Sequence, residues 1–136
     1  MILFGKKDQP SRNAYAVVTG AGSGIGRSFA LELAKRGGNV VCADINLEAA
    51  EETVKLVEQL GQKAFAVKCD VGQAEQVQVL ADQAEQLLEH PVTLIINNAG
   101  VGLGGKFDEM SLEDWKWCMH VNLWGVIHGC HAFVPK

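Results

Sequence analysis

Four short runs of apolar, often β-branched residues recur along the chain, separated by longer segments with a helical spacing of apolar positions. The runs are 14–19 (AYAVVT), 39–44 (NVVCAD), 64–68 (AFAVK) and 94–97 (LIIN). Runs of this kind, without polar alternation, are typical of strands that are buried on both faces of a parallel sheet. The pattern therefore predicts four parallel strands.

The segments between these runs carry apolar residues three and four positions apart, which is the spacing of one face of an α-helix. Such stripes cover residues 25–34, 47–57 and 77–88. Gly37 follows the first stripe and Pro91 the third, and both residue types commonly end helices. Alternating strands and helices, joined by right-handed crossovers, predict an α/β fold with helices on both faces of the sheet.

A fourth helix is predicted to begin after Ser111, an N-cap residue with Asp114 in the capping-box position. Residues 117–127 are apolar almost all round, so we expect cover from a second surface, either the rest of a larger domain or another subunit. We do not expect a membrane span over residues 115–134, because it would desolvate five polar side chains, namely Lys116, His120, Asn122, His128 and His131.

Composition narrows the function classes. The 136 residues are 48% hydrophobic with a formal net charge of −4, which fits one globular domain without a basic surface for nucleic acid. We expect residues 1–13 to be a lead-in to a domain that spans 14–136. Four cysteines match no metal-ligand or redox-pair spacing, so we expect reduced thiols in the cytoplasm and no metal site; they are Cys42, Cys69, Cys118 and Cys130.

The most informative segment is TGAGSGIG, residues 19–26, between the first predicted strand and the first predicted helix. Glycines allow a tight turn and the unpaired amides of a helix N-terminus attract anions, so the segment predicts a phosphate site. The pattern G-x-G-x-x-G fits neither from Gly20 nor from Gly22. A P-loop nucleotidase is a weak alternative, because Ala21 and Arg27 stand at two of the four defining positions.

The spacing that does fit is T-G-x-x-x-G-I-G, and further motifs follow it in order. The matching residues are Gly20, Gly24 and Gly26, then Asp70 and Val71, N-N-A-G at 97–100, and Asn122. In this combination the chain resembles the short-chain dehydrogenase/reductase family. The resemblance implies a Rossmann-type, doubly wound parallel sheet in three layers, with strand order 3-2-1-4. It also implies an NAD(P)-dependent oxidoreductase that transfers hydride between nicotinamide and a small alcohol or carbonyl substrate.

The resemblance also assigns cofactor contacts. The glycine loop would hold the diphosphate, Asp44 would accept hydrogen bonds from the adenosine ribose, and Asp70 with Val71 would bind adenine. The backbone of 98–100 would approach a ribose, since small residues permit close contact. The residues so implied are Gly20, Gly22, Ser23, Gly24, Ile25, Gly26, Asp44, Asp70, Val71, Asn98, Ala99 and Gly100.

Asp44 ends the second predicted strand, where a carboxylate can bind both ribose hydroxyls and would repel a 2′-phosphate. NADP users of the family tend to have a basic residue at positions that hold Ser23 and Ile45 here. We therefore expect a preference for NAD over NADP. The alternative is that Asp44 only caps the next helix, although Asn46 is better placed to do so.

Asn122 matches the family's active-site asparagine, which by resemblance orders a water in a proton relay. An asparagine within an apolar run must find hydrogen-bond partners, so the alternative is a fully bonded structural side chain. Asn97 and Thr19 resemble the family's structural pair, which ties the fourth strand to the glycine loop.

The family's catalytic tyrosine, lysine and serine have no counterparts here. The only tyrosine is Tyr15, in the first predicted strand, and Thr19 stands four positions later. We expect the cofactor-binding half of an enzyme, truncated after the fourth strand and its following helix, and inactive alone. The alternative is a non-catalytic dinucleotide-binding or assembly module. The open apolar edge of 94–96 predicts that the chain alone aggregates, oligomerises or binds a complementing piece. The resemblance implies a homo-oligomer through the helix from Ser111 onward.

Overall fold

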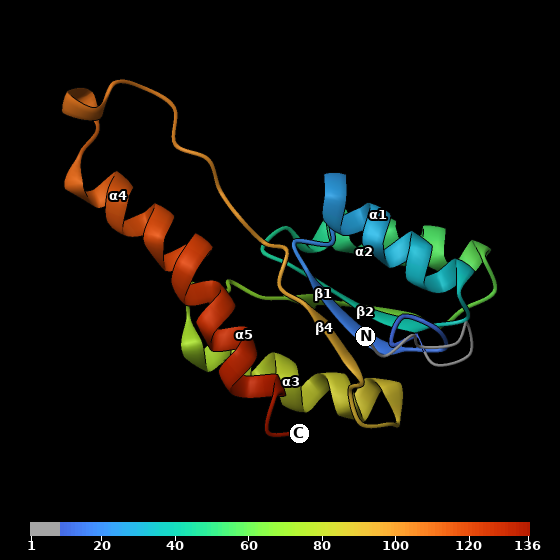
Figure 1. Ribbon diagram of the computed structural model, residues 1–136. Helices are drawn as coiled ribbons and strands as arrows, with labels where there is room; N and C mark the ends of the chain where they lie inside the picture. Colours follow the sequence, from blue (N-terminus) through green and yellow to red (C-terminus); the bar gives the residue numbers. More distant parts are fainter. Residues whose placement is uncertain (1–8) are drawn as a thin grey trace, which may run out of the picture.

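A computed structural model describes residues 9–136, so the predicted lead-in at 1–13 lies partly outside the described residues. The described part contains a four-stranded parallel sheet in the order β3-β2-β1-β4 (Figure 1). Strand direction and order confirm the predicted doubly wound sheet. The strands are β1 (Tyr15–Thr19), β2 (Asn39–Asp44), β3 (Ala64–Lys68) and β4 (Leu94–Ile96).

Helices cover both faces of this sheet, and alternating strand residues point to one face or the other. The helices are α1 (Gly24–Lys35), α2 (Leu47–Gln59), α3 (Ala74–Leu88), α4 (Leu112–Met119) and α5 (Gly125–Phe133). Ala16 and Val18 of β1 pack with α1 and α2, whereas Val17 packs with α3 and α5. Figure 1 shows the resulting three layers. Burial on both faces explains why the strands are continuous apolar runs.

The helix predicted from Ser111 onward begins as expected but changes its geometry midway. Ser111 and Asp114 form the predicted capping box, and their hydrogen bonds lower the pKa of the Asp114 carboxyl. A short 3-10 turn, η1 (Phe107–Glu109), precedes α4, and a π-helical turn, η2 (His120–Trp124), separates α4 from α5. Because a π turn adds a residue to the helical repeat, the side chains before and after it point in different directions than a regular helix predicts.

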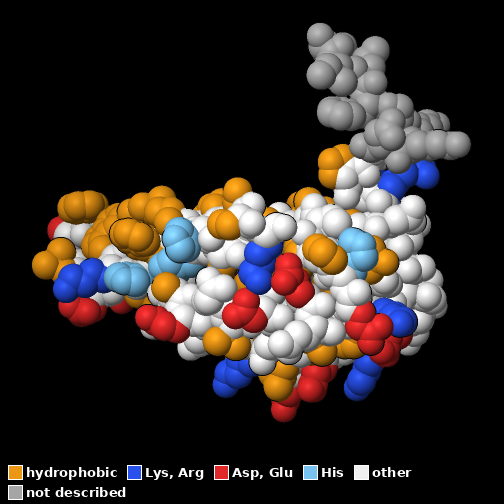
Figure 2. Space-filling model, turned by 90° about the horizontal axis from the view of Figure 1, so that it is seen from below, with side chains coloured by type: hydrophobic (Ala, Val, Ile, Leu, Met, Phe, Trp, Pro, Cys, Tyr) orange, Lys and Arg blue, Asp and Glu red, His pale blue; other side chains and the backbone are white. Residues whose placement is uncertain are grey.

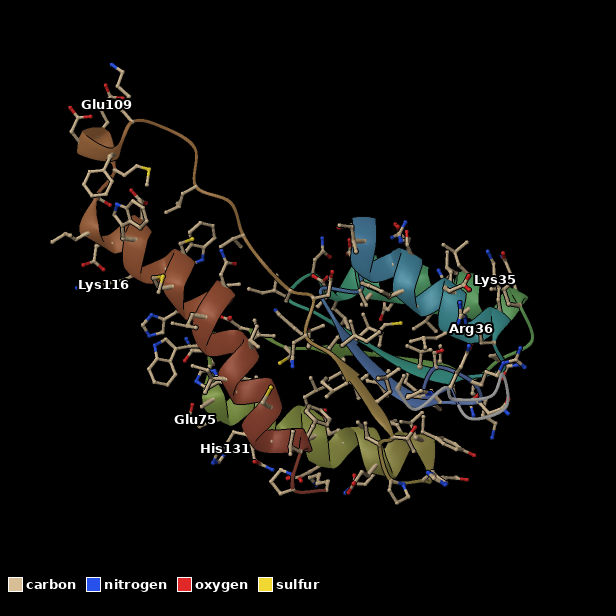
Figure 3. All side chains as sticks on the ribbon, in the orientation of Figure 1. Lys35, Arg36, Glu75, Glu109, Lys116 and His131 are labelled. Carbon is tan, nitrogen blue, oxygen red and sulfur yellow. The ribbon has the colours of Figure 1, made fainter. Side chains whose placement is uncertain are left out.

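The two ends of this long helix differ in burial. α5 lies against α3 and buries Ala132 and Phe133 under the sheet. α4 projects beyond the sheet and contains no buried residue; Glu109 and Lys116 mark this end in Figure 3. Hydrophobic side chains gather there in Figure 2, as expected for a helix that needs further cover. The large exposed ones in α4 and η2 are Leu112, Trp117, Met119, Leu123 and Trp124.

Membrane crossing requires a long, continuously apolar helix. None of the helices within residues 9–136 has the length and apolarity to cross a membrane.

Candidate functional site

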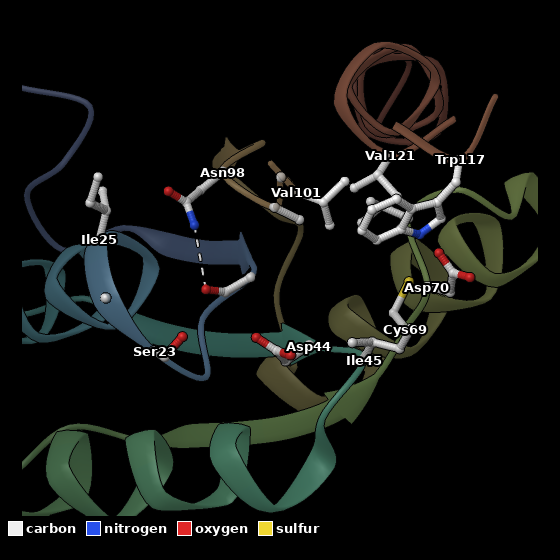
Figure 4. Close-up of a pocket in the computed structure, with 15 residues that line it drawn as sticks. Ser23, Ile25, Asp44, Ile45, Cys69, Asp70, Asn98, Val101, Trp117 and Val121 are labelled. Carbon is white, nitrogen blue, oxygen red and sulfur yellow. Dashed lines mark hydrogen bonds between the residues drawn. The ribbon is translucent and has the colours of Figure 1, made fainter. Parts of the chain in front are cut away.

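The loops that follow the strands meet at the carboxyl edge of the sheet and form a pocket of about 440 Å³ (Figure 4). Ligands of open α/β sheets bind at this edge, where the strand order reverses, which here is between β1 and β4. The pocket brings together every predicted cofactor residue except Gly22 and Gly26. The lining residues are Gly20, Ser23, Gly24, Ile25, Asp44, Ile45, Cys69, Asp70, Val71, Asn98, Ala99, Gly100, Val101, Trp117 and Val121.

The glycine loop turns sharply between β1 and α1, and its backbone requires glycine at two positions. Gly20 has a φ of +66°, and a Cβ there would lie 2.9 Å from the Ala99 Cα. A Cβ on Gly26 would collide with the carbonyl oxygen of Gly20 and lie 2.6 Å from the Asn98 Nδ2. Gly26 therefore lets the start of α1 pack directly against the loop beneath the pocket, which explains why it does not line the cavity.

The start of α1 offers unpaired amides to the pocket. Ser23 is the N-cap but makes no side-chain cap bond, and the amides of 24–26 have no helical carbonyl one turn earlier. The amides of Ala21 and Gly22 are already used, by the Ala43 carbonyl at 3.1 Å and by Asp44 Oδ2 at 2.8 Å. The loop thus divides its donors: the earlier amides anchor it to β2, and the later ones, with the helix dipole, form an end that can bind an anion.

Asp44 is held in one orientation at the end of β2. Its Oδ2 accepts the Gly22 amide at 2.8 Å and its Oδ1 accepts the Asn46 amide at 2.9 Å. The cap of α2 belongs to Asn46, whose side chain accepts the Ala49 amide at 3.2 Å, as predicted. Asp44 is therefore not the cap of α2, and its carboxylate lines the pocket beside the glycine loop.

A buried polar pair supports the loop from below. Thr53 of α2 is fully buried and donates to the Ala21 carbonyl at 2.8 Å. Its hydroxyl also accepts from Arg27 Nε at 3.0 Å, and Arg27 reaches Glu52 at 3.1 Å. Arg27, which aligns with the lysine of a P-loop, is therefore committed to the protein. This arrangement argues against a P-loop use of the residue.

The residue that ties β4 to the glycine loop is Asn98, and the predicted pairing of Asn97 with Thr19 is wrong. The Asn98 side chain donates to the Thr19 carbonyl at 3.1 Å, and Thr19 Oγ1 accepts the amides of both Asn98 and Ala99 at 3.1 Å. Asn97 points toward α5, where its Nδ2 lies 3.7 Å from Cys130 Sγ. Its buried Oδ1 has no hydrogen-bond partner among the described residues.

The loop after β3 is fixed from several sides. Asp70 Oδ1 accepts the Gly72 amide at 2.9 Å, and the Asp70 amide donates to Gln76 Oε1 at 2.9 Å. The Val71 carbonyl accepts a hydrogen bond from His128 Nδ1 at 2.8 Å, so that nitrogen carries the proton. Burial, and to a lesser extent the Asp70 charge, raises the pKa of the neighbouring Cys69 thiol to about 11. This thiol is therefore neutral near pH 7.

Asn122 lies outside this pocket, on the π turn η2. Its Oδ1 accepts the Val101 amide at 2.8 Å, and its Nδ2 donates to the Val101 carbonyl at 2.8 Å. Both polar groups of the amide thereby pair with one residue of the loop after β4. Asn122 borders a second cavity of about 410 Å³, together with Met110, Trp115 and Cys118.

Several pocket residues were missed by the sequence analysis. Ile45 and Val101 directly follow predicted residues and Cys69 directly precedes one, so their positions beside strand ends were a usable signal. Val121 and Trp117 lie one helical turn apart on the last helix. Which face of that helix meets the pocket depends on its tertiary placement, and the sequence pattern does not carry this information.

Metal-ligand clusters and the tyrosine are the remaining candidates for chemistry outside the pocket. Within residues 9–136, no cluster of three or more His, Cys, Asp or Glu side chains could hold a metal ion. Tyr15 lies at the amino end of β1, opposite the pocket edge, and stacks on His90 with ring centroids 3.8 Å apart. Tyr15 cannot reach a ligand in the pocket.

The family assignment rests on sequence and structure comparisons. The model of the family described as short chain dehydrogenase matches residues 14–136. The chain is 37% identical over 121 residues to the 7alpha-hydroxysteroid dehydrogenase of Escherichia coli K12. It is 41% identical over 124 residues to the cyclohexanol dehydrogenase of Acinetobacter sp. SE19. These alignments cover 89% and 90% of this chain but 47% and 49% of the relatives, so it spans about half their length.

A solved structure gives the same result. The crystal structure of a short chain dehydrogenase/reductase from Burkholderia phymatum in complex with NAD matches with a TM-score of 0.88 and 42% identity. The match covers 93% of this chain and 45% of that chain. This chain corresponds to the N-terminal portion of the family's members. By sequence and by fold, it therefore belongs to the short-chain dehydrogenase/reductase family.

Proposed function

We propose that this chain binds NAD and forms the cofactor-binding half of an enzyme that transfers hydride between nicotinamide and an alcohol or carbonyl substrate. The relatives of this chain in its family include dehydrogenases. The proposal rests chiefly on one observation: Gly24 and Ile25, whose amides begin α1 without a helical partner, line the pocket beside the oriented Asp44 carboxylate. An anion-binding helix end next to a carboxylate suits a diphosphate joined to a ribose.

Each part of the pocket would bind one part of NAD. The amides of 24–26 would hold the diphosphate, Asp44 would accept from the adenosine ribose hydroxyls, and Asp70 with Val71 would hold adenine. Since Thr19 Oγ1 already binds the amides of Asn98 and Ala99, the backbone of 98–100 would meet the second ribose through its carbonyl groups. When bound, nicotinamide supplies the hydride chemistry.

NAD would be preferred over NADP for an electrostatic reason. A 2′-phosphate would sit against the Asp44 carboxylate, which two backbone amides hold in place. The neighbouring pocket residues Ser23 and Ile45 carry no positive charge that could compensate. Arg27 follows the glycine loop in the first turns of α1, but its guanidinium is bonded to Thr53 and Glu52. The pocket therefore favours a free ribose hydroxyl.

The group that gives or takes the hydroxyl proton would lie outside residues 14–136. Tyr15 is at the wrong edge of the sheet, and Asn122 uses both its polar atoms on Val101. The curated relatives are about twice as long as this chain. We propose that the serine, tyrosine and lysine of the family's second half complete the enzyme, and that residues 14–136 alone bind cofactor without turnover.

Isothermal titration calorimetry with NAD, NADP and magnesium ATP tests the binding proposal. We expect NAD to bind with a Kd on the order of 10–100 μM, NADP to bind about tenfold more weakly, and ATP to bind no better than NADP. Absence of NAD binding would contradict the proposal. Tighter binding of magnesium ATP would instead support a P-loop use of the glycine loop.

The enzyme proposal needs a separate experiment. Nicotinamide absorbance would follow hydride transfer from an alcohol, with the chain alone and with the chain joined to the second half of a relative. We expect turnover only in the joined protein. If the joined protein binds NAD but catalyses no transfer, the result favours the alternative, a non-catalytic dinucleotide-binding or assembly module.

We also propose that the protein works as a homo-oligomer in the cytoplasm, with the helix from Ser111 onward at the contact. The exposed apolar side chains of α4 support the contact, and the four free thiols fit a reducing compartment. Sedimentation equilibrium should give a mass of at least two chains. A monomer at all concentrations would overturn the assembly proposal.

A further inference from the structure

One wall of the pocket comes from a residue that the motifs of the sequence do not include. The indole of Trp117 extends from α4 into the pocket, and Figure 4 shows it lying between Val121 and Asp70. Its side chain is 50% exposed although it borders a cavity, so a large aromatic face is open to a ligand. We propose that Trp117 contacts the cofactor directly by stacking on the adenine ring. This inference rests on the proposed function.

The loop after β3, which lies beside the indole in the pocket, is rigid. Val71 is buried, and its carbonyl accepts a hydrogen bond from His128 Nδ1 at 2.8 Å. Gly125 brings α5 close to this residue, since a Cβ there would lie 2.7 Å from Val71 Cγ2. Asp70 is held by the Gln76 side chain and the Gly72 amide. A flat base that enters here would meet the fixed loop after β3 and the face of the indole.

Aromatic stacking is the chemistry that suits this position. Every nucleobase has a π face, and a half-exposed indole gains by covering its own apolar surface as well. The adenine amino group would remain beside Asp70, which can accept from it. Trp117 therefore adds a contact to the face of the ring, whereas the strand-end residues bind its edge.

The neighbouring helical residues supply a matched control. Val121 lies one turn after Trp117 and borders the same pocket. Trp124 is exposed to nearly the same extent, at 47%, but lies beyond the start of the π turn and does not border the pocket. Replacing Trp124 removes a similar amount of exposed aromatic surface from the same helix at a residue that does not line the pocket; its one aromatic neighbour is His128, at 5.8 Å between ring centroids.

Calorimetric titration of the Trp117→Ala, Trp117→Phe and Trp124→Ala variants tests the inference, with NAD, ADP-ribose and nicotinamide mononucleotide as ligands. We expect Trp117→Ala to weaken NAD and ADP-ribose about tenfold and to leave nicotinamide mononucleotide unchanged. Trp117→Phe should retain most of the affinity, because it keeps an aromatic face. Trp124→Ala should bind all three ligands like the unchanged protein.

A second readout separates stacking from a general disturbance of α4. AMP should quench the indole fluorescence of the unchanged protein and of Trp124→Phe, and the quenching should be lost in Trp117→Phe. Equal NAD affinity in Trp117→Ala and the unchanged protein would overturn the stacking inference alone. Failure of the unchanged protein to bind NAD would overturn the proposed function itself, so the two failures are distinguishable.

Discussion

The sheet with its flanking helices and the projecting helix α4 differ in how they bury apolar surface. In the sheet both faces are covered, and Val17 and Val41 are fully buried. In α4 no residue is buried, and Leu112 is 76% exposed. The first region is stabilised by its own core, whereas the second offers apolar surface to a further partner. The pocket lies where the two regions meet, so its glycine-loop side is rigid and its α4 side depends on what covers that helix.

Paired leucine substitutions should give the largest difference between the two regions. Leu80 of α3 is fully buried, whereas Leu123 of η2 is 46% exposed. Leu80→Ala should lower the free energy of unfolding by about 3 kcal/mol, because it leaves a cavity in the core. Leu123→Ala should change it by less than about 0.5 kcal/mol. Urea denaturation measures both, and equal losses would show that the two regions are packed alike.

Glycine substitutions test the close approach at the base of the pocket. Gly26→Ala should cost about 2 kcal/mol of stability and weaken NAD, because the new Cβ meets the Gly20 carbonyl, a backbone atom that cannot yield cheaply. Gly102→Ala is the control, since a Cβ there meets nothing within 4 Å. Thermal unfolding and NAD titration measure the pair. A Gly26→Ala variant as stable as Gly102→Ala would contradict the close packing of loop and helix.

Asp44 should affect cofactor choice more than stability. Asp44→Ala removes the ribose acceptor and the repulsion of a 2′-phosphate, so NAD should bind about tenfold more weakly and the preference over NADP should disappear. Glu52→Gln is a matched control, because it changes a carboxylate near the loop that does not line the pocket. An unchanged ratio of NAD to NADP affinity in Asp44→Ala would remove this residue from the account.

Thiol reactivity should separate buried from exposed positions without any substitution. Burial raises the pKa of Cys42 to about 12 and, with the Asp70 charge, that of Cys69 to about 11. Iodoacetamide at pH 8 should therefore modify the exposed Cys130 at least about a hundredfold faster than either buried thiol. Mass spectrometry of the labelled peptides measures this, and comparable labelling of Cys42 would show that the sheet opens readily.

The same thiols predict a stability change at alkaline pH. Because their pKa values are raised above the ordinary value of 9.0, the folded protein holds neutral thiols. The contribution of these two thiols to stability is complete below pH 9 and is lost as the pH rises toward 11. In that range the two thiols ionise in the unfolded chain but stay largely neutral in the folded protein. Urea midpoints measured across this range should therefore fall.

The sequence predicted the sheet well because its signals are local. Each strand is a short apolar run, and Asn46 and Ser111 cap the helices they were expected to cap. The wrong choice between Asn97 and Asn98 has a simple cause. The pairing of Asn97 with Thr19 came from the family resemblance, whereas β4 ends at Ile96 and the two adjacent asparagines beyond it point to different sides of the sheet. The apolar pattern cannot resolve a one-residue difference at a strand end.

The α4 side of the pocket was less predictable for a physical reason. Periodicity gives the faces of a helix but not the angle at which the helix leaves the sheet. The π turn at 120–124 also adds a residue that no hydrophobic pattern marks. Asn122 and Trp117 therefore occupy positions that only the three-dimensional arrangement shows.

The proposed function depends above all on the first turn of α1, which would hold the diphosphate of NAD. Amide chemical shifts recorded by NMR during a titration with NAD test it most directly. We predict that the amides of Gly24, Ile25 and Gly26 shift most and exchange more slowly with solvent, while Gly102 stays unchanged. Saturable NAD binding that leaves those three amides unshifted would contradict the account.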